Sequence, residues 1–493
     1  MACPPSPNAT ATCLGGVCGT ACAGGFGDCD RDRANGCEVD TRTSGTHCGA
    51  CGRPCPAGLY CGGGTCRPSH AWSRRFGGSS SSGSGRDVAV DAAGNLYVTG
   101  YFSGTVDFGG TPLSSSGIYD VFVASFTSAG VHRWSRRFGG SGAQYGRAVA
   151  LDRSGNVFVT GEVSGSVDFG GGPLVGAGRG DAFVVALSSL GAHRWSRRFG
   201  DAEQQVGTSI ALDRSGNVVI AGNFQGTVDF GGRPLVCAGG DDIFVASLSS
   251  GGAHLWSRRF GDSESQFIDD IATDLGGDIV ITGQFRGELN LGTRSLGAFA
   301  GGADAFLVGL NSAGEHRWSN RFGDSGDQGG RSVAIDSAGS IYLVGSFGET
   351  VDFGGEPLRS SGDSDAYLAS FTSVGGYRWS RRFGDSSRQE GRSVAVTDGT
   401  VLLTGSCQGN VDFGGGPLAC AGFDDAFVAG FSASGAHLWS RRFGDSGYQF
   451  GDGIAVADRG GVVFTGSFGG TVDFGGGPLT SAIRDIFLVN LVP

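Results

Sequence analysis

Residues 146–200 read GRAVALDRSGNVFVTGEVSGSVDFGGGPLVGAGRGDAFVVALSSLGAHRWSRRFG. Runs rich in β-branched and aromatic residues alternate here with turns of Gly, Asn, Asp and Ser, and they cover 147–152, 157–161, 181–187 and 193–199. Such runs without a helical period are typical of antiparallel strands joined by turns. The stretch predicts four successive strands, with an extended segment folded at its glycines between the second and the third.

The stretch recurs along the chain with a nearly constant period. The phrase W-S-R-R-F-G marks each copy, Asn320 is its one departure, and the tryptophans lie 60 to 62 residues apart at Trp72, Trp134, Trp195, Trp256, Trp318, Trp379 and Trp439. A fixed internal period decides the architecture before any local motif is considered. Four strands per period are typical of one blade of a β-propeller. We therefore predict an all-β, seven-bladed β-propeller.

The distribution of strand types predicts how the ring closes. The last third-type strand, 485–491, is followed by no Trp strand before the end at Pro493, whereas 70–76 is a Trp strand that precedes the first complete blade. We predict that 70–76 completes the seventh blade together with 451–491, which leaves no open strand edge in the ring. The propeller is then expected to occupy 69–493, preceded by a separate head at 1–68.

Eleven of the 14 cysteines lie in residues 1–66. A segment so dense in cysteine and so poor in apolar residues is expected to be stapled by disulfides, irregular in structure and exported. Zinc ligation is the alternative, because the cysteines at 48, 51, 55, 61 and 66 include a C-x-x-C pair. The odd count leaves Cys3 as the obvious spare thiol. The first residues lack a signal-peptide pattern, so we expect an export signal to be removed or to lie upstream.

Three carboxylates in the head, Asp28, Asp30 and Asp32, follow D-x-D-x-D spacing. A calcium loop of the EF type is excluded, because its sixth and twelfth positions hold neither the Gly nor the Glu that such a loop needs. A calcium site of another geometry, completed by Asn35 or Glu38, stays open as an alternative. We expect no other cofactor.

The seven copies can be compared as samples of one pattern. The V-D-F segment has Asp in six copies and Asn290 in the fourth, and the first Arg of W-S-R-R is replaced in that same copy by Asn320. Because both charges are lost together, we predict an ion pair between this Asp and this Arg in each blade. At the closure of the ring the pair would be Asp473 with Arg74.

Two cysteines of the sixth copy are expected to form a disulfide. Cys407 stands where five other copies have Phe, and Cys420 occupies a position of small residues in the same copy. A covalent bond would then replace aromatic packing. Cys237 aligns with Cys420 in the third copy, where Phe224 is retained, so we expect it to be a buried free thiol.

The loops that join each Trp strand to the next copy suggest a binding surface. In a propeller such loops surround one mouth of the central channel, and they carry a repeated acid and amide at Asp201, Gln205, Asp262, Gln266, Asp324, Gln328, Asp385, Gln389, Asp445 and Gln449. A ring of this kind could bind cations, sugars or a basic partner. The alternative is a solvated acidic rim of turn-forming residues. Histidines that recur two residues before the Trp are interpreted as scaffold.

The repeated phrases also resemble a known family. D-x-x-G-N-x-Y/F-V-T-G, at 91–100 and 152–161, followed by D-A-F-V-A and W-S-R-R-F-G, is similar to the seven-bladed β-propeller repeat family of bacterial cell-surface and secreted proteins, over about residues 70–493. The head, at 28–38 and 47–55, resembles a Cys-rich module of bacterial surface proteins. The resemblance implies the fold and an extracellular or cell-surface location, and it implies no particular ligand.

We therefore expect a monomeric, non-catalytic binding or scaffold protein whose partner is an unknown glycan or protein. The net charge of −11 argues against nucleic-acid binding, and no apolar run of 18 residues predicts a transmembrane helix. A propeller enzyme stays open as a second class, either a hydrolase or lyase with a cluster of His, Glu, Tyr or Arg in one or two blades, or a quinoprotein-like enzyme. A purely structural envelope protein is the third.

Overall fold

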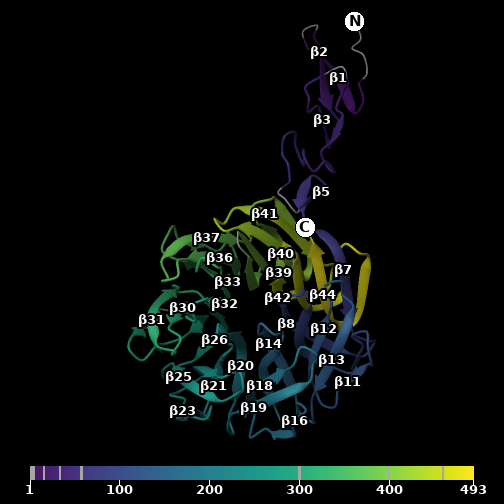
Figure 1. Cartoon of the computed structure of the whole chain (residues 1–493). Helices are drawn as coiled ribbons and strands as arrows, with labels where there is room; N and C mark the ends of the chain where they lie inside the picture. Colours follow the sequence, from purple (N-terminus) through teal and green to yellow (C-terminus); the bar gives the residue numbers. More distant parts are fainter. Residues whose placement is uncertain are drawn as a thin grey trace.

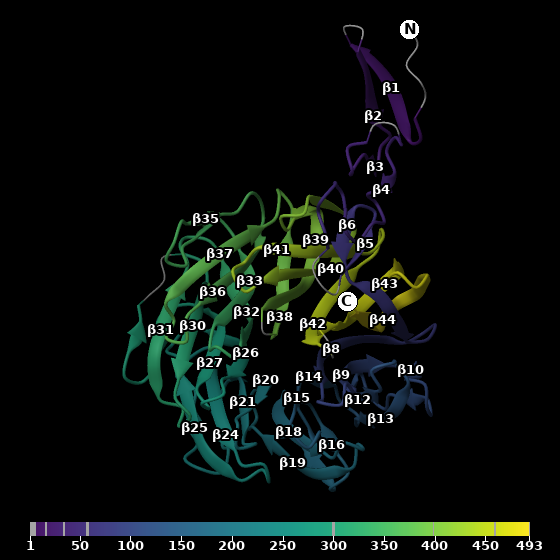
Figure 2. The same ribbon diagram turned by 45° about the horizontal axis from the view of Figure 1, so that its top comes forward.

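The computed structural model describes residues 6–14, 17–32, 35–55, 59–297, 301–397, 399–457 and 460–492. Its named elements are all β-strands, arranged as a ring of small sheets with a slender N-terminal head projecting from one edge (Figures 1 and 2). No helix in this part of the chain is long and apolar enough to cross a membrane. The predicted all-β propeller is confirmed.

Blade two shows the plan of each repeat. Its four strands pair antiparallel in chain order: β14 (Gln144–Leu151), β15 (Val157–Val163), β18 (Asp181–Leu187) and β19 (His193–Phe199). A side hairpin, β16 (Ser166–Asp168) with β17 (Pro173–Val175), connects the second strand to the third. Every residue of β18 is buried, because neighbouring blades cover both faces of the sheet.

The same plan gives the other blades. Blade one holds β8 (Ser82–Val90), β9 (Leu96–Ser103), β10 (Thr105–Val106), β11 (Leu113–Ser114), β12 (Asp120–Phe126) and β13 (His132–Phe138). Blade three holds β20 (Gln205–Leu212), β21 (Val218–Phe224), β22 (Thr227–Val228), β23 (Leu235–Val236), β24 (Asp242–Leu248) and β25 (His254–Phe260). Blade four holds β26 (Gln266–Thr273), β27 (Ile279–Phe285), β28 (Leu289–Asn290), β29 (Ser295–Leu296), β30 (Asp304–Leu310) and β31 (His316–Phe322).

The remaining blades follow. Blade five holds β32 (Gln328–Ile335), β33 (Ile341–Phe347), β34 (Thr350–Val351), β35 (Leu358–Arg359), β36 (Asp365–Phe371) and β37 (Tyr377–Phe383). Blade six holds β38 (Gln389–Thr397), β39 (Thr400–Asp412), β40 (Pro417–Ser432) and β41 (His437–Phe443), its side hairpin being continuous with β39 and β40. Blade seven holds β42 (Gln449–Val456), β43 (Val462–Asp473), β44 (Pro478–Val492) and β7 (Ser69–Phe76).

The two ends of the chain meet in blade seven. Strand β7 pairs antiparallel with β44, with Arg74 opposite Leu488. One parallel bridge from Arg484 to Ser82 then joins blades seven and one into a sheet of eight strands. The predicted closure of the ring by the N-terminal Trp strand is therefore present.

Five of the tryptophans hydrogen-bond to the blade that follows their own. Trp134 Nε1 donates a hydrogen bond of 2.9 Å to the Ser189 carbonyl, in the turn between the third and fourth strands of the next blade. Its ring lies against Gly191, where a Cβ would meet it at 2.7 Å and where φ is +75°, so only glycine fits. Trp72 makes the same bond, of 2.9 Å, to Ser128 of blade one and so carries the lock across the closure.

The predicted ion pair between Asp473 and Arg74 is wrong, because Asp473 is engaged within its own hairpin and the ion pair at this seam is made by Arg75. Asp473 Oδ1 accepts the backbone N–H groups of Gly475 at 2.6 Å and Gly477 at 3.0 Å, within its own hairpin. The first Arg of the phrase reaches the next blade instead, as when Arg136 Nε donates to the Gly191 carbonyl at 3.0 Å.

Blade four shows why the two charges could be lost together. Asn320 Nδ2 makes the interblade bond at 2.7 Å, to the Gly375 carbonyl, and Asn290 Oδ1 accepts the hairpin N–H of Gly292 at 2.8 Å. Each Asn therefore preserves the hydrogen bond of the charged residue it replaces. The joint substitution does not report a contact between the two positions.

The second Arg of the phrase forms the conserved ion pair. In each blade it contacts the buried Asp that opens the third strand, and the pairs are Arg137–Asp120, Arg198–Asp181, Arg259–Asp242, Arg321–Asp304, Arg382–Asp365, Arg442–Asp425 and, at the closure, Arg75–Asp485. Arg75 Nε and Asp485 Oδ2 are 2.5 Å apart. Burial raises the pKa of Asp304, to about 6, against the charge of Arg321.

The head consists of short hairpins held by disulfides. Its strands are β1 (Ala9–Leu14), β2 (Val17–Cys22), β3 (Phe26–Gly27), β4 (Val39–Asp40), β5 (Tyr60–Gly62) and β6 (Thr65–Arg67). The described bonds are Cys22–Cys37, Cys29–Cys51, Cys48–Cys61 and Cys55–Cys66. Cys3 lies outside the described residues. The head meets blade six, where Arg441 Nη1 donates to the Pro68 carbonyl at 3.4 Å.

Candidate functional site

The amides of the predicted binding rim are buried clamps within the loops. Gln205 is fully buried, its Oε1 accepts the Asp201 N–H at 3.1 Å, and its Nε2 donates to Asp201 Oδ1 and to the Gln225 carbonyl, both at 2.8 Å. The same set of bonds surrounds Gln266, Gln328, Gln389 and Gln449. These amides therefore have no free donor to offer a ligand.

The acids of the rim are also engaged locally. Asp201 Oδ1 accepts the Glu203 N–H at 2.9 Å, and Oδ2 accepts the Thr227 N–H at 2.7 Å. Burial acts to raise the pKa of Asp201, but these hydrogen bonds hold it below its ordinary value, as they do for Asp385 and Asp445. Asp262 and Asp324 carry equivalent bonds. The predicted rim holds the loops in shape, and the alternative of turn-forming residues describes it better.

The residues that differ between blades lie just inside this rim, in the channel. The first strand of each blade has a β-bulge, for example between Gly146 and Ala148. A bulge adds one residue that the ladder does not pair and re-aims its side chain. The bulged residues are Arg86, Arg147, Thr208, Asp269, Arg331, Arg392 and Asp452, and all of them line a cavity of about 430 Å³ in the middle of the ring.

Charges in this channel are concentrated on blades five to seven and one. Arg392 contacts Asp452 at 2.7 Å and Glu390 at 2.9 Å, and Arg388 pairs with the other oxygen of Glu390. Asp452 also accepts the Ser84 hydroxyl at 2.8 Å and lies 3.6 Å from Arg86. Burial raises the pKa of Asp452, but the charges of Arg86 and Arg392 bring it below its ordinary value. The result is a network of alternating charge.

Two acids on opposite sides of the channel have raised pKa values. Burial raises the pKa of Asp87 to about 7, against the N–H groups of Val149 and Val88, which both donate to it at 2.8 Å. Burial also raises the pKa of Asp270, which accepts the hydroxyl groups of Ser209 at 2.7 Å and Ser332 at 2.8 Å. Both carboxyl groups are thus bound by the framework.

An aromatic stack leads from solvent to these charges at the mouth that the rim surrounds, here called the upper mouth. Phe423 and Tyr448 stack with ring centroids 4.8 Å apart and an angle of 14°, although they are 61% and 49% exposed. Phe450 lies 6.3 Å beyond Tyr448, and the Arg392 guanidinium lies 4.5 Å over its ring. In blades one and two, Tyr101, Tyr119 and Tyr145 form a second aromatic cluster.

The opposite mouth, here called the lower funnel, differs in chemistry. It is a cavity of about 940 Å³, formed where the first strands end and turn into the second. Aliphatic side chains from five of these strands line it, namely Leu151, Leu212, Ile335, Val396 and Val456. The channel therefore has a charged, aromatic upper end and an aliphatic lower end.

The head offers one carboxylate cluster and no free zinc site among its described cysteines. Carboxylate oxygens of Asp28, Asp30 and Glu38 lie within 4.8 Å of one another. Asp32, the third predicted residue, is absent from this cluster, although its N–H donates to Asp30 Oδ1 at 2.8 Å. These three acids are the residues that could hold a calcium ion.

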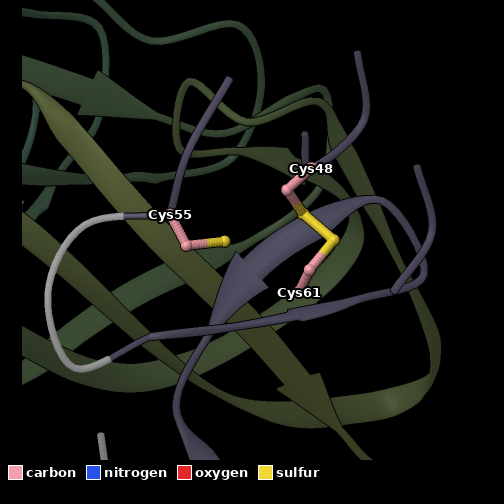
Figure 3. Close-up of side chains that lie close together, drawn as sticks. All are labelled: Cys48, Cys55 and Cys61. Atoms are coloured by element: carbon pink, nitrogen blue, oxygen red, sulfur yellow. A yellow bond between two sulfur atoms is a disulfide. The ribbon is translucent and has the colours of Figure 1, made fainter. Parts of the chain in front are cut away.

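The zinc alternative is wrong for these cysteines, because their sulfur atoms are bonded in disulfides. The sulfur atoms of Cys48, Cys55 and Cys61 also lie within 4.8 Å of one another. Figure 3 shows that Cys48 and Cys61 are joined, and Cys55 is bonded to Cys66. A disulfide sulfur is not the thiolate that binds zinc, so these residues staple the head.

In blade six, Cys407 and Cys420 are joined by a disulfide, the pair that the sequence predicts. Cys407 is fully buried at the end of the second strand, and Cys420 lies three residues before Phe423. The bond therefore anchors the segment that presents the aromatic stack. Cys237 is a free thiol, half-buried rather than fully buried, and burial raises its pKa.

The channel residues were missed by the sequence analysis, although a signal for them exists. Residues that recur in every repeat build the framework of the blades. A specific binding site is therefore expected at positions where the repeats differ. The bulged position reads Arg, Arg, Thr, Asp, Arg, Arg and Asp from blade one to blade seven, directly after a recurring glycine in six of the copies. Comparing the copies for variation, rather than for recurrence, would have found it.

A match to a family model supports the fold. A family described as "Beta-propeller repeat" matches residues 71–101 and 133–165. The propeller domain of the Trilobed protease from Pyrococcus furiosus has a similar structure, with 8% identity, a TM-score of 0.40, and coverage of 82% of this chain and 93% of that one. These two segments of the chain are similar to the repeats of this family.

Two curated relatives match over long stretches. "Regulatory protein FlaEY" of Caulobacter vibrioides is 24% identical over 428 residues, which cover 79% of this chain and 43% of that protein. "Uncharacterized WD repeat-containing protein L264" of Acanthamoeba polyphaga mimivirus is 23% identical over 329 residues, covering 53% of this chain and 24% of that protein. The chain thus spans less than half the length of either relative.

Proposed function

We propose that this protein is a non-catalytic binding protein, secreted or displayed at the cell surface, and that it binds a glycan at the upper mouth. One observation carries the proposal, namely the exposed stack of Phe423 on Tyr448 that continues through Phe450 to Arg392. Exposed aromatic rings at the mouth of a cavity are uncommon on a surface without a binding role.

The chemistry around the stack suits a sugar chain. Aromatic rings offer apolar surface to the C–H faces of sugar rings, and a few placed polar groups fix the orientation of a ligand. Arg388 and Arg392 offer donors, Glu390 and Asp424 offer acceptors, and Gln408 lies 3.4 Å from Asp424. The mixed signs favour a ligand rich in hydroxyl groups over one that is purely cationic or anionic.

The state of four of the five channel acids supports binding without catalysis; the fifth, Asp269, pairs with Arg331 at 3.3 Å through Oδ1, and its Oδ2 has no hydrogen-bond partner among the described residues. Asp87, Asp270, Asp452 and Glu390 each accept hydrogen bonds or ion pairs from the framework. A general acid or base must instead face the substrate with a free proton site. The disulfides of the head and of blade six favour an oxidising, extracellular compartment.

A glycan array, followed by calorimetry with the bound sugar, tests the proposal. We expect Tyr448→Ala combined with Phe423→Ala to weaken binding by about tenfold or more, as for removal of aromatic anchors elsewhere. Val236→Ala, which truncates an equally exposed apolar side chain on the outer hairpin β23, should leave binding unchanged. Failure of every glycan to bind, or cleavage of the one that binds, would overturn the proposal.

A further inference from the structure

The lower funnel has the properties of a ligand pocket in its own right. Its volume of about 940 Å³ lies in the range of small-molecule sites, and its wall combines aliphatic side chains at the strand ends with polar and charged residues of the turns that follow. The aliphatic side chains at the ends of the first strands are only half-buried, so the ring leaves apolar surface open to the cavity. The described lining contains no Phe, Tyr or Trp, and this argues against a stacked sugar.

Three arginines converge on one side of the funnel. Arg153 and Arg214 lie in the turns after the first strands of blades two and three, and Arg194 lies on β19. All three are exposed, and within the described part of the chain none has an ion pair or a side-chain hydrogen bond. In a chain of net charge −11, three free cations beside an apolar cavity are unusual.

Four acids also line the funnel, and each accepts N–H groups of its own turn; Asp274 accepts those of Gly276 and Asp278, and Asp336 those of Ala338 and Ser340. Asp152 accepts the N–H groups of Ser154 and Asn156 and the Asn156 side-chain amide. Asp213 holds the next turn in the same way, through Ser215 and Asn217. Both carboxylates point back into their own turns, where they shape the loop that carries the arginine.

Arg194 differs from the arginines at the same position in other blades. Arg133 donates to Tyr97 Oη at 3.0 Å and Ser125 Oγ at 2.9 Å, Arg378 donates to Ser370 Oγ at 3.3 Å, and Arg317 pairs with Asp278. In blade two, Phe158 and Ala186 replace the Tyr and the Ser. The blade thus keeps the guanidinium but has lost its internal acceptors, as expected if an external anion is the partner.

From this arrangement we propose that the lower funnel binds a small amphiphilic carboxylate. The apolar chain lies against the ring of Leu212, Ile335 and Val396, and the carboxylate lies toward blades two and three, where Arg194 receives it between Arg153 and Arg214. Guanidinium groups bind carboxylates through paired hydrogen bonds, which are among the stronger contacts at a surface. This site is separate from the upper mouth and does not depend on its ligand.

Calorimetry with monomeric decanoate, and with decyltrimethylammonium as the cationic counterpart, tests the proposal. We expect decanoate to bind the full chain, and Arg153→Ala, Arg194→Ala and Arg214→Ala together to weaken it by about tenfold or more. Arg133→Ala is the matched control, since it removes an arginine from the same position of blade one, and it should not change the affinity. Tyr448→Ala at the other mouth should not change it either.

Four results would overturn the inference: no binding of decanoate, equal affinity in the triple variant, equal or tighter binding of decyltrimethylammonium, or binding to phosphatidylglycerol vesicles without binding of monomeric decanoate. The last result would assign the arginines to a membrane surface. The three side chains are exposed, so their removal should leave the melting temperature of the ring unchanged.

Discussion

The upper mouth and the lower funnel are built by opposite ends of the same seven inner strands, yet their side chains differ in kind. At the upper end each strand carries a bulge whose extra residue is an arginine, an aspartate or a threonine. At the lower end the strands pair regularly, and half-buried aliphatic residues such as Leu151 and Ile335 face the cavity.

The difference follows from the pairing of the strands. A bulged residue stands outside the ladder, so the sheet places little constraint on its identity. A residue in regular alternation packs on one side against the core between blades, so it stays apolar. The fold therefore separates a polar end that varies between blades from an end where aliphatic residues recur on the inner strands, and substitutions can affect one end, the other or both.

A substitution that weakens the closure of the ring should lower stability the most, and it should affect both the upper mouth and the lower funnel. Asp485→Ala removes the buried partner of Arg75 at the closure. Loss of one partner from a buried pair costs about 3 to 5 kcal/mol, and we expect about 3 because Arg75 is one-third exposed. Urea unfolding measures the change, and ligand binding at both mouths should fall with it.

Arg74→Ala is the control for this seam, because Arg74 is the neighbour to which the sequence analysis assigned the ion pair. It is exposed and unpaired with Asp473, so its removal should change the free energy of unfolding by less than about 0.5 kcal/mol. A loss as large as that of Asp485→Ala would restore the original pairing of Arg74 with Asp473.

The disulfide of blade six should affect the upper mouth alone. Cys407 and Cys420 enclose a short loop, and opening a loop of this size costs about 2 to 3 kcal/mol. Because Phe423 follows Cys420 by three residues, Cys407→Ala with Cys420→Ala should also weaken glycan binding. Decanoate binding in the lower funnel should persist, and its loss together with glycan binding would show that the two ends are coupled.

The sequence was sufficient for the architecture because the repeats are redundant. Seven copies of W-S-R-R-F-G and the misplaced first copy at 70–76 define both the blade and the closure by β7 and β44. The same redundancy explains the error over Asn290 and Asn320. Two positions that change in one copy were interpreted as a contact, whereas each replacement preserves its own hydrogen bond.

The site could not be predicted in the same way, because burial is not visible in a repeated motif. Asp201 and Gln205 are residue types that are common in binding surfaces. Only the structure shows that their side chains hydrogen-bond to each other and that Gln205 also hydrogen-bonds to the backbone. Arg388, Glu390 and Arg392 lie close together in sequence, but Asp452 joins them from the next blade, and Arg86 joins them only through closure of the ring.

A pH titration should distinguish the channel from the rest of the framework. Burial raises the pKa of Asp87 to about 7, so the folded state binds a proton that the unfolded state has released by about pH 4. Its contribution to stability is present below about pH 4 and is lost as the pH rises through 7. A fully buried group would account for about 4 kcal/mol, and we expect about half because the channel admits water.

The variant Asp87→Asn should flatten the decline in stability between about pH 4 and 7, most clearly above pH 6. Arg86 and Asp270 also act on this carboxyl group, and Asp304, with a pKa of about 6, contributes at lower pH. The readout is therefore the slope of the melting temperature against pH, compared with the native chain. An unchanged slope would show that Asp87 is ionised throughout this range.

The smallest expected effect comes from the clamp beneath the upper mouth. Gln389→Leu leaves the Gln408 carbonyl and the Asp385 N–H without their partner, at a cost of about 1 to 2 kcal/mol. Because Gln389 lies between Arg388 and Glu390 in the chain, glycan binding should weaken while decanoate binding does not. Ser386→Ala, an exposed change in the same loop, is the control. If Gln389→Leu left both stability and glycan binding intact, the amide would not shape the upper mouth, and the original interpretation of the rim as a ligand surface would regain its place.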